Sequence, residues 1–423
     1  MRILSGSKAA AQVRKLAARS ARYASVEPAV RGIVADVRRR GDQAVRRYAE
    51  RFDGVRPGTA LRVPEKEIRR AWSDADMKFK GALETAAANI RRFCEMQKPA
   101  EWTRSRNGIS LGQIVRPLES VGCYVPGGRH PLVSTLLMTV IPAQVAGVEA
   151  IRVVSPNVHR DVLAAAAMLG VREVYRVGGA QAIAALAYGT DSIPRVDKIV
   201  GPGNSYVTVA KKEVAFDCSI DFLAGPTEGL IVSDTGTAEF IASDLVAQAE
   251  HDPEAMTVFI TTKRELAKSV ARYVDEMCRE NAVAKESIRH NGVIFVSTSR
   301  KQSFDWANEI ACEHLTIDRE DITLVRNAGS LFISDYSAQA AGDYASGPNH
   351  VLPTGGAARF RGGLSVLDFV KVISVQELSR PGLRRIGPAI ETLATTEGLS
   401  AHARSIRVRC ESPVSTRAGS VHA

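Results

Sequence analysis

The sequence predicts an α/β protein with two doubly wound, incomplete Rossmann-like parallel-sheet domains, an N-terminal helical segment and a small C-terminal appendage. Two observations support this fold class. Short β-rich runs alternate with apolar helical segments at the intervals of βαβ units, and the alternation stops and starts again about halfway along the chain. The length of 423 residues also exceeds what one ordinary core accommodates, so more than one domain is expected.

The first half of the chain opens with helices and continues with one set of strands and helices. Apolar residues at three and four spacing, such as Val30, Ile33 and Val37, predict a helix-rich region from about residue 25 to 93. A strand over residues 120–125 ends at Pro126-Gly127-Gly128. Further strands are predicted over 151–154, 174–177 and 198–200, with helices over 134–148, 162–169 and 180–188. This spacing implies a parallel sheet.

The second half repeats the architecture without a repeated sequence. Strands are predicted over 229–232, 258–261, 292–296, 315–317 and 331–334, with helices over 238–249, 265–278 and 304–312. Beyond about residue 364 the segments become short and mixed, and the end from Ser412 is polar enough to fray. The division that we predict is an arm over 1–24, a first Rossmann-like domain over 25–122 plus 229–364, a second over 123–228, and a small C-terminal domain over 365–423.

The composition indicates a soluble cytoplasmic enzyme. Six cysteines lie far apart and form no CxxC pair, which favours reduced thiols. The N-terminus lacks the apolar run of a signal peptide, and polar residues and Pro142 interrupt the most apolar stretch, residues 131–148, so we expect no membrane partner. The chain has 56 Lys and Arg against 46 Asp and Glu. Acidic residues interrupt the arginine runs at 38–40 and 46–47, so a solvated helix face is favoured over a nucleic-acid patch.

Several polar segments stand at the ends of predicted strands and helices, and they contain most of the residues that could bind a metal or transfer a proton. Four of the eight histidines lie in them. Taken alone, each has an ordinary structural explanation, such as a helix cap, a turn carboxylate or a surface histidine. Together they predict a catalytic metal site, and nitrogen and oxygen ligands without cysteine suit zinc, manganese or cobalt. The segments carry Gln248 with His251, Glu313 with His314, Asp343, His350, Glu397 and His402.

The dipeptide Glu313-His314 stands just before the predicted strand 315–317. A histidine with a pKa near neutrality is the natural general base for an alcohol proton. An adjacent carboxylate can either orient that base or activate a water. The pair is therefore the candidate acid/base centre, although such a dipeptide is common in structural roles.

Glycine turns mark a candidate ligand edge. No GxGxxG fingerprint occurs. Instead, turns at 124–128, 178–181 and 201–204 each follow a predicted strand of the first sheet, and they bring Tyr124, Gln181 and Asn204 with them. Such turns gather at the carboxyl edge of a parallel sheet, where nucleotides bind. Thr227, in the turn 224–228, offers a hydroxyl for a substrate.

Taken together, these segments resemble the histidinol dehydrogenase family from about residue 25 to 409. Several motifs in a fixed order are far more specific than any one of them. They are VGCYVPGG (121–128), MTVIPAQVAGV (138–148), VGGAQAIAALAYGT (177–190), VGPGNSYV (200–207), AGPTE (224–228), SDLVAQAEHDP (243–253), GDYASGPNHVLPT (342–354), SVQEL (374–378) and EGLSAH (397–402).

The resemblance implies a homodimer that oxidises L-histidinol to L-histidine through the aldehyde, with two NAD and one zinc per site. It implies that the domain 25–122 plus 229–364 carries the catalytic and metal residues, that 123–228 carries the NAD edge, and that the C-terminal segment crosses to the other subunit. By this similarity the metal ligands are Gln248, His251, Asp343 and His402. The acid/base pair is Glu313 and His314, further substrate contacts are Thr227, His350 and Glu397, and the NAD contacts are Tyr124, Gln181 and Asn204.

Two departures from the family pattern and three alternatives accompany this interpretation. Cys312 stands where the family usually has proline, and Thr227 stands where serine is common.

The nearest alternative is a related zinc and NAD dehydrogenase that acts on another small alcohol. A second is a metal hydrolase in which Glu313 activates water and no hydride moves. A third is a structural or nucleic-acid binding protein that uses the net charge of +10.

Overall fold

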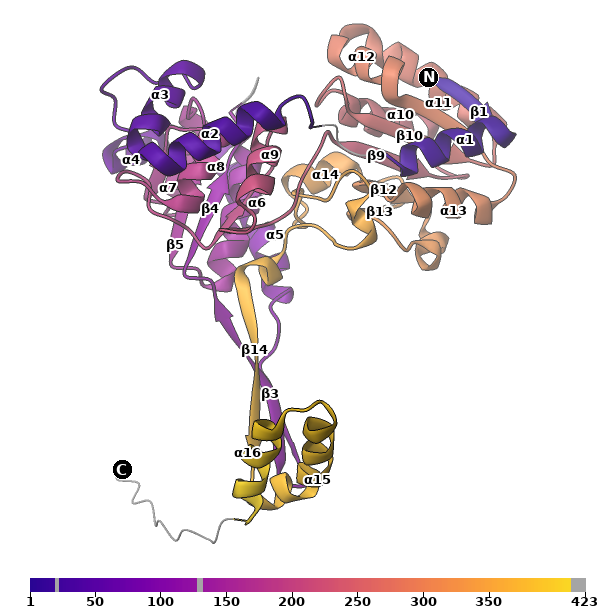
Figure 1. Ribbon diagram of the computed structural model, residues 1–423. Helices are drawn as coiled ribbons and strands as arrows, with labels where there is room; N and C mark the ends of the chain where they lie inside the picture. Colours follow the sequence, from indigo (N-terminus) through magenta and orange to yellow (C-terminus); the bar gives the residue numbers. More distant parts are fainter. Residues whose placement is uncertain (20–22, 128–131, 412–423) are drawn as a thin grey trace. The chain divides into compact units, whose positions relative to one another are not determined.

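A computed structural model describes residues 1–19, 23–127 and 132–411 of the chain, so Gly128 and the end from Ser412 lie outside the described residues. The chain divides into two units (Figure 1). The first comprises Met1–Lys98 and Leu118–Phe369, and the second comprises Pro99–Pro117 and Val370–Ala423. The first unit contains two parallel sheets, which confirms the predicted doubly wound fold class.

The larger sheet has six parallel strands in the order β1-β11-β10-β9-β12-β13. Its strands are β1 (Arg2–Ser5), β9 (Glu228–Val232), β10 (Met256–Thr261), β11 (Gly292–Val296), β12 (His314–Ile317) and β13 (Ser330–Ile333). The helices around it are α1 (Gly6–Ala17), α10 (Ala238–Ala249), α11 (Arg264–Met277), α12 (Ala282–Asn291), α13 (Arg300–Ile310) and α14 (Gln339–Tyr344), with short 3-10 turns η1 (Cys278–Glu280) and η2 (Arg319–Leu324).

Helices cover both faces of this sheet because successive side chains of its strands are apolar. Val258 and Ile260 of β10 belong to a core with α1 and α13, whereas Phe259 between them belongs to a core with α10, α11 and α12. Successive side chains of a strand point to opposite faces, so a continuous apolar run is what a strand buried on both sides requires. Figure 1 shows the two helical layers on either side of the strands.

The second sheet has five parallel strands in the order β6-β5-β4-β7-β8. The strands are β4 (Ser120–Tyr124), β5 (Ala150–Val154), β6 (Glu173–Tyr175), β7 (Lys198–Val200) and β8 (Ser219–Ile220). Its connecting helices are α6 (Val133–Ala146), α7 (Arg160–Met168), α8 (Gly179–Tyr188) and α9 (Ser205–Val214). The carboxyl ends of β4, β6 and β7 lead into the three predicted glycine turns.

The N-terminal helices pack differently from the predicted division. These helices are α2 (Glu27–Arg40), α3 (Asp42–Phe52), α4 (Glu65–Ser73) and α5 (Met77–Met96), as the helical spacing indicated. Their most extensive contacts are with α6, α7, α8 and α9 of the five-stranded sheet, whereas the predicted division placed them with the sheet that carries Glu313 and His314. Residues 1–24 are also more than a helical arm, because β1 is an edge strand of the six-stranded sheet. Helical periodicity identifies an element and its apolar face, but it does not identify the sheet that this face covers.

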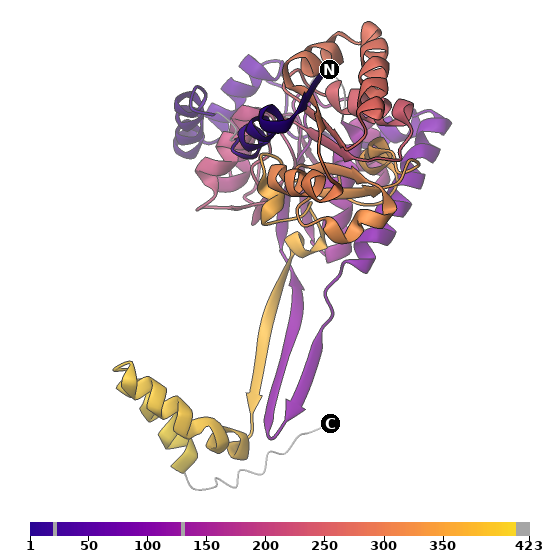
Figure 2. The same ribbon diagram turned by 90° about the vertical axis from the view of Figure 1, so that its right-hand side faces the viewer.

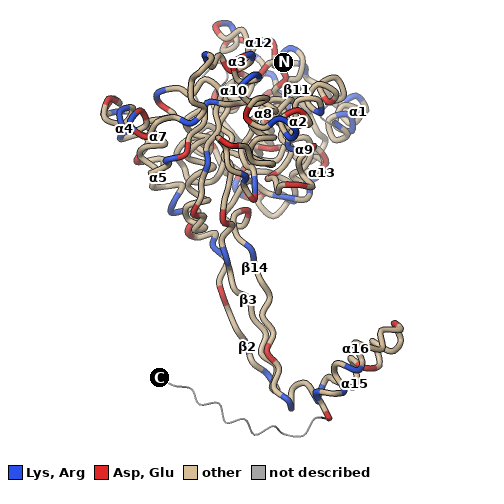
Figure 3. The backbone as a smooth tube through the Cα atoms, turned by 60° about the vertical axis from the view of Figure 1, so that its left-hand side comes forward, with Lys and Arg blue, Asp and Glu red and all other residues tan. Residues whose placement is uncertain are grey.

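Basic and acidic residues are interspersed along these helices. Asp36 lies in ion pairs with Arg39, Arg40 and Arg47, so part of the positive charge is balanced within the helical region. Figure 3 shows positions of both signs along the chain. Within the described residues, none of the helices combines the length and the apolar character that a membrane span requires.

The second unit is built on a three-stranded antiparallel sheet in the order β14-β3-β2 (Figure 2). Its elements are β2 (Trp102–Arg106), β3 (Ile109–Pro117), β14 (Val370–Leu378), α15 (Arg380–Thr396) and α16 (Ser400–Glu411); the short turns η3 (Ala357–Arg359) and η4 (Val366–Phe369) precede it in the first unit. The prediction of short, mixed segments beyond residue 364 was therefore wrong, since β14 has nine residues and α15 has 17. The partner of β14 lies some 260 residues earlier in the chain, and local sequence patterns contain no information on such a pairing.

One glycine of the ligand edge gives a test of this packing. Gly201 has a φ of +111°, and a Cβ built on it lies 2.2 Å from the carbonyl oxygen of Tyr124. We expect Gly201→Ala to lower the free energy of unfolding by roughly 3 kcal/mol, because backbone atoms cannot give way as a flexible side chain does. Urea unfolding followed by circular dichroism measures the loss.

Gly170→Ala is the matched control. Gly170 also has a positive φ, +71°, but a Cβ there meets nothing within 4 Å. Only the conformational cost remains, about 1 kcal/mol. Equal losses in the two variants would contradict the close approach of the turn to β4.

Candidate active site

The predicted acid/base pair lies at the amino ends of two neighbouring strands. His314 is the first residue of β12, and Glu313 precedes it. β12 pairs in parallel with β9, and His314 is level with Gly229. Thr227, which directly precedes β9, therefore comes beside Glu313. The site uses the amino edge of the six-stranded sheet, whereas ligands of open α/β sheets usually bind at the carboxyl edge.

The Glu313 carboxylate is buried and held by two donors. Its Oε2 accepts a hydrogen bond of 2.7 Å from the Thr227 hydroxyl and one of 2.9 Å from the backbone N–H of Glu228. The side chain is 7% exposed. The Thr227 hydroxyl also lies 3.1 Å from Oε1 of Gln248. The threonine therefore connects the carboxylate to the last turn of α10.

The His314 imidazole lies between two carboxylates. Its Nε2 is 3.2 Å from Oδ1 of Asp343, and its Nδ1 is 3.6 Å from Oε2 of Glu313. Its ring stacks on Phe332 with the ring centroids 5.8 Å apart. Burial alone would lower the pKa of His314, but the charge of Glu313 and the contact with Asp343 raise that pKa to about 10. A group that competes for the Asp343 carboxylate would bring His314 back toward the range of a general base.

Asp343 lies on α14 and joins two histidines. Its carboxylate contacts His314, and its backbone carbonyl accepts a 2.7 Å hydrogen bond from Nδ1 of His350. Burial opposes ionisation of Asp343, but the hydrogen bond and charge of His314 outweigh it and lower the pKa of the carboxyl. The charges of His350 and His251 act in the same direction. Asp343 is therefore an anion in this arrangement.

Gln248 and His251 come from the C-terminal end of α10. Gln248 is buried in the last turn, and His251 is exposed two residues beyond the helix. The backbone N–H of His251 donates to the carbonyl of Gln248, which keeps the two residues on one turn. The charge of His251 contributes to the lowered pKa of Asp343. The first unit therefore contains an amide oxygen, an imidazole and an ionised carboxylate among the predicted ligands.

This donor set fits a metal bound by nitrogen and oxygen. Among the buried side-chain atoms that the structure describes, Nδ1 of His314 is one of the few without a hydrogen-bond partner, so this site is not internally satisfied. Cys312 offers no thiolate, because burial raises the pKa of its thiol. Its Sγ lies 3.1 Å from the carbonyl oxygen of His314 and donates to it. Cys312 therefore ties the turn that carries the acid/base pair.

Glu397 and His402 lie in the second unit. Glu397 is the C-cap of α15, and His402 is in the first turn of α16. Both are exposed. The other predicted site residues lie in the first unit, so one chain contributes two separate groups of them.

The predicted NAD residues lie at the carboxyl edge of the five-stranded sheet. The Tyr124 hydroxyl accepts a hydrogen bond of 3.1 Å from the N–H of Gly179. The Gln181 amide donates 3.0 Å to Asp53. Tyr124 and Gln181 are 3% and 2% exposed, so both side chains are buried beneath the surface of this edge. Asn204 is exposed, and its Oδ1 caps α9.

Asp53 and Glu228 are polar residues of these regions that the sequence patterns did not single out. One oxygen of Asp53 accepts hydrogen bonds from Gln181 and from the N–H of Gly178. Burial raises the pKa of Asp53. Glu228 is 4% exposed and stands beside Glu313. Glu228 belongs to the motif AGPTE, and its position at the start of an apolar strand was the available signal.

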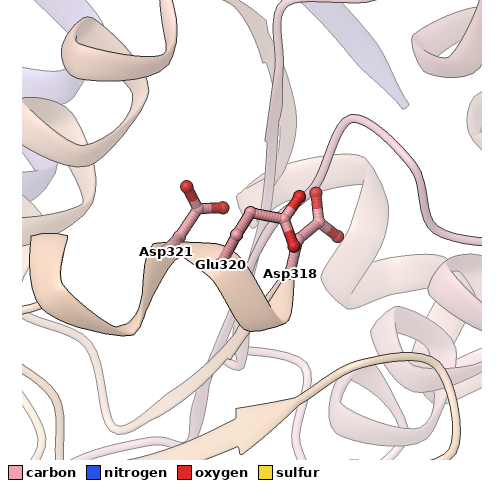
Figure 4. Close-up of side chains that lie close together, drawn as sticks. All are labelled: Asp318, Glu320 and Asp321. Atoms are coloured by element: carbon pink, nitrogen blue, oxygen red, sulfur yellow. The ribbon is translucent and has the colours of Figure 1, made fainter.

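An acidic cluster at the opposite edge of the six-stranded sheet has a structural explanation. Asp318, Glu320 and Asp321 lie close enough together to hold a cation, and Figure 4 shows them along the start of η2. Arg300, however, lies in ion pairs with Asp318, Asp321 and Asp234. The Ser233 hydroxyl adds a hydrogen bond of 2.6 Å to Asp318. The negative charge of the cluster at the carboxyl edge is therefore balanced by Arg300.

Comparison with known proteins agrees with the sequence motifs. The histidinol dehydrogenase family model matches residues 16–410. The histidinol dehydrogenase of Methanothermobacter thermautotrophicus is 48% identical over 395 residues, which cover 90% of this chain and 92% of the relative. This chain belongs to the histidinol dehydrogenase family. The histidinol dehydrogenase of Bacillus cereus is 46% identical over 400 residues, covering 92% of this chain and 93% of the relative.

A solved structure extends the comparison to the fold. The crystal structure of histidinol dehydrogenase from Elizabethkingia anophelis has a TM-score of 0.92 with this chain, covers 97% of this chain and 98% of its own, and is 33% identical. The resemblance to the histidinol dehydrogenase family and the oxidoreductase class are therefore confirmed. The matched region contains all the predicted site residues, from Tyr124 to His402. The roles of the single residues stay predictions.

The Arg300 cluster predicts a pH-dependent stability difference. Burial opposes ionisation of Asp318 and Asp234, but their hydrogen bonds and Arg300 lower the pKa of both carboxyls. A depressed pKa contributes stability above the unfolded pKa, near 4, and this stability is lost as the pH falls through the folded value. We expect Arg300→Met to destabilise the protein by about 3 kcal/mol at pH 7, because buried carboxylates lose their partner.

Urea unfolding at pH 7 and at pH 4 measures this effect. The difference between Arg300→Met and the unmodified protein shrinks at pH 4, where the variant's carboxyls are protonated. The control is Arg272→Met, which removes an exposed pair with Glu276 and should change the stability little at either pH. A loss that is the same at both pH values would contradict the ionic origin of the contribution.

Proposed function

We propose that this chain oxidises L-histidinol to L-histidine through L-histidinal, in two successive hydride transfers to NAD at a zinc site. The observation that carries the proposal is the buried pair Glu313 and His314, in contact with Thr227 and Asp343, in a member of this family. An alcohol oxidation needs a base for the hydroxyl proton, and the second oxidation needs one water to hydrate the aldehyde. The site contains one candidate for each task.

His314 accepts the hydroxyl proton of the alcohol while the hydride leaves the same carbon, which produces the aldehyde. Glu313 then accepts a proton from a water whose oxygen attacks the aldehyde carbon, and His314 returns its proton to the aldehyde oxygen, which gives the hydrate. Loss of one hydroxyl proton of that hydrate to His314 and of a second hydride to NAD leaves the carboxylic acid. The sum consumes one water and two NAD for each histidinol. Both side chains are buried, and a site that excludes water would keep the aldehyde from bulk solvent.

Gln248, His251, Asp343 and His402 would hold the zinc. Bound there, the metal would anchor the imidazole and amine nitrogens of the substrate as a template. Manganese and cobalt suit the same oxygen and nitrogen donors. The metal ligands also contact substrate in this proposal, together with His314.

Thr227, His350 and Glu397 would complete the substrate site. His350 is held by the carbonyl of Asp343, and its Nε2 lies 3.3 Å from the Thr135 hydroxyl, so its ring has a fixed orientation. A carboxylate such as Glu397 suits the cationic amine of histidinol. These polar partners favour histidinol over a plain alcohol, and a paralogous dehydrogenase of another small alcohol is the alternative.

Tyr124, Gln181 and Asn204 would bind NAD, which supplies the hydride acceptor. Within the described part of the chain, the atoms left for a ligand are the O–H of Tyr124, Oε1 of Gln181 and Nδ2 of Asn204, because their other side-chain polar atoms are engaged within the protein. The glycine turns allow a close approach at this edge. A Cβ on Gly127 would lie 2.1 Å from the carbonyl oxygen of Pro156.

The active unit in this proposal is a cytoplasmic homodimer with shared sites. In the second unit, Val372, Ile373 and Val375 of β14 are 50%, 44% and 37% exposed, and Leu111 of β3 is 47% exposed. A sheet with so much exposed apolar surface is suited to cover by a second copy. Glu397 and His402 would then reach the partner's site. We propose no nucleic-acid or membrane partner.

The first test counts NADH. With L-histidinol as limiting substrate, we expect about two NADH per histidinol, loss of activity on treatment with a chelator, and recovery when zinc is added back. Absorbance at 340 nm measures the yield. No NADH from histidinol by zinc-loaded protein would move the proposal to the paralogous dehydrogenase. Turnover that survives complete metal removal would contradict the zinc site.

The second test concerns the shared sites. His314→Ala and His402→Ala should each be inactive as homodimers. In heterodimers that form on mixing, one of the two sites has both defects and the other has none, so up to about one quarter of the activity returns when subunits exchange at random. Absence of recovery, with exchange verified by differently tagged subunits, would place both residues in one subunit's site.

A further inference from the structure

Arg19 connects three segments of the first unit behind the candidate acid/base pair. Its Nε donates 2.6 Å to Oε1 of Glu228, and its Nη2 donates to Oε2 of the same carboxylate. Its Nη1 donates 2.8 Å to the carbonyl of Leu16 and 2.8 Å to the carbonyl of Ile310. One guanidinium therefore joins the end of α1, the end of α13 and the start of β9.

Two of these segments set the position of Glu313. Ile310 ends α13 three residues before Glu313. Glu228 supplies the N–H that binds the Glu313 carboxylate, and it follows Thr227, which supplies the other donor. The guanidinium thus fixes the distance between the segment that carries the carboxylate and the segment that carries its two donors.

Among the residues that the structure describes, Arg19 is the main partner of the Glu228 side chain. Glu228 is 4% exposed, and the N–H of Gly355 donates 2.9 Å to its Oε1. Burial raises the pKa of Glu228, the hydrogen bond and charge of Arg19 lower it, and the nearby charge of Glu313 raises it. Two buried carboxylates on adjacent strand ends repel each other, so a fixed cation is needed to keep both in place.

We propose that Arg19 is a positioning residue that acts through Glu228 to fix the Glu313 carboxylate for its work on water. This rests on the proposed function of Glu313 in hydration of the aldehyde. Arg19 itself contacts neither the predicted metal ligands nor the predicted substrate residues among its hydrogen bonds. Its role is therefore expected in the second half-reaction, where Glu313 acts, and not in the first.

The test is single-turnover formation of NADH, with zinc-loaded enzyme in excess over histidinol. The variant is Arg19→Gln, which keeps a donor but loses the charge and the bidentate geometry. We expect the first NADH to form within about threefold of the unmodified rate and the second to slow by about tenfold or more, because small displacements of a catalytic group cost that much. The KM for histidinol and the zinc content stay unchanged.

The double variant Arg19→Gln with Glu228→Gln tests whether the two residues act as one unit. We expect its second phase to be no slower than that of the slower single variant. If the slowing of the second NADH in the double variant equals the product of the slowing in the two single variants, the two residues act independently and the coupling is overturned. Arg19→Lys is the second variant if Arg19→Gln does not fold, because it keeps the charge but loses the bidentate geometry, and the second phase should again be the slower one.

Arg359→Gln is the matched control. Arg359 donates to the carbonyls of Ala17 and Glu309, and so bridges the ends of the same two helices, α1 and α13, without a bond to Glu228. We expect both phases to stay within about twofold, since the carboxylate donors are untouched. Equal slowing of both phases in Arg19→Gln, or no slowing at all, would overturn the proposal. The unmodified enzyme measured alongside separates this failure from a failure of the proposed function, which would appear as no NADH from histidinol in that enzyme.

Discussion

The candidate site depends on one buried carboxylate, Glu313, held between two parallel strands. An ionised group in an apolar core is costly unless hydrogen bonds satisfy it, and here a hydroxyl and a backbone N–H from the start of β9 do so. The pairing of β9 with β12 fixes where those donors lie. His314 follows in the chain and takes its place beside the same carboxylate, so the geometry of the pair is a consequence of strand register.

The two parallel sheets use opposite edges. At the carboxyl edge of the six-stranded sheet, the carboxylates of Asp318 and Asp234 form ion pairs with Arg300. They also accept hydrogen bonds from the hydroxyls of Ser233 and Thr261. The candidate site therefore stands at the amino edge of that sheet, where α10 returns and delivers Gln248. The five-stranded sheet follows the general rule, since its glycine turns lie at the carboxyl edge. The first unit thus presents two chemically different edges, one with the predicted acid/base pair and one with the glycine turns.

Local patterns in the sequence predicted the elements well and their assembly less well. The helix 238–249 and the strand 292–296 have the predicted bounds, because apolar periodicity and β-rich runs are properties of neighbouring residues. The placement of α2–α5 on the five-stranded sheet and the pairing of β14 with β3 depend on contacts between distant segments. Nothing local distinguishes the alternatives for such contacts.

The same distinction applies to the site. Thr227, Glu313, His314 and Asp343 carry recognisable chemistry and lie in motifs, so the sequence could identify them, and the structure brings them into contact. Arg19 and Glu228 are 209 residues apart, and neither has a motif of its own that indicates the other. A buried charge at the start of an apolar strand does, however, require a partner. Here the partner is Arg19, and its remaining donors bind the segment that leads to Glu313. The ion pair therefore helps to position the candidate site, although Arg19 lies some 300 residues before that site in the chain.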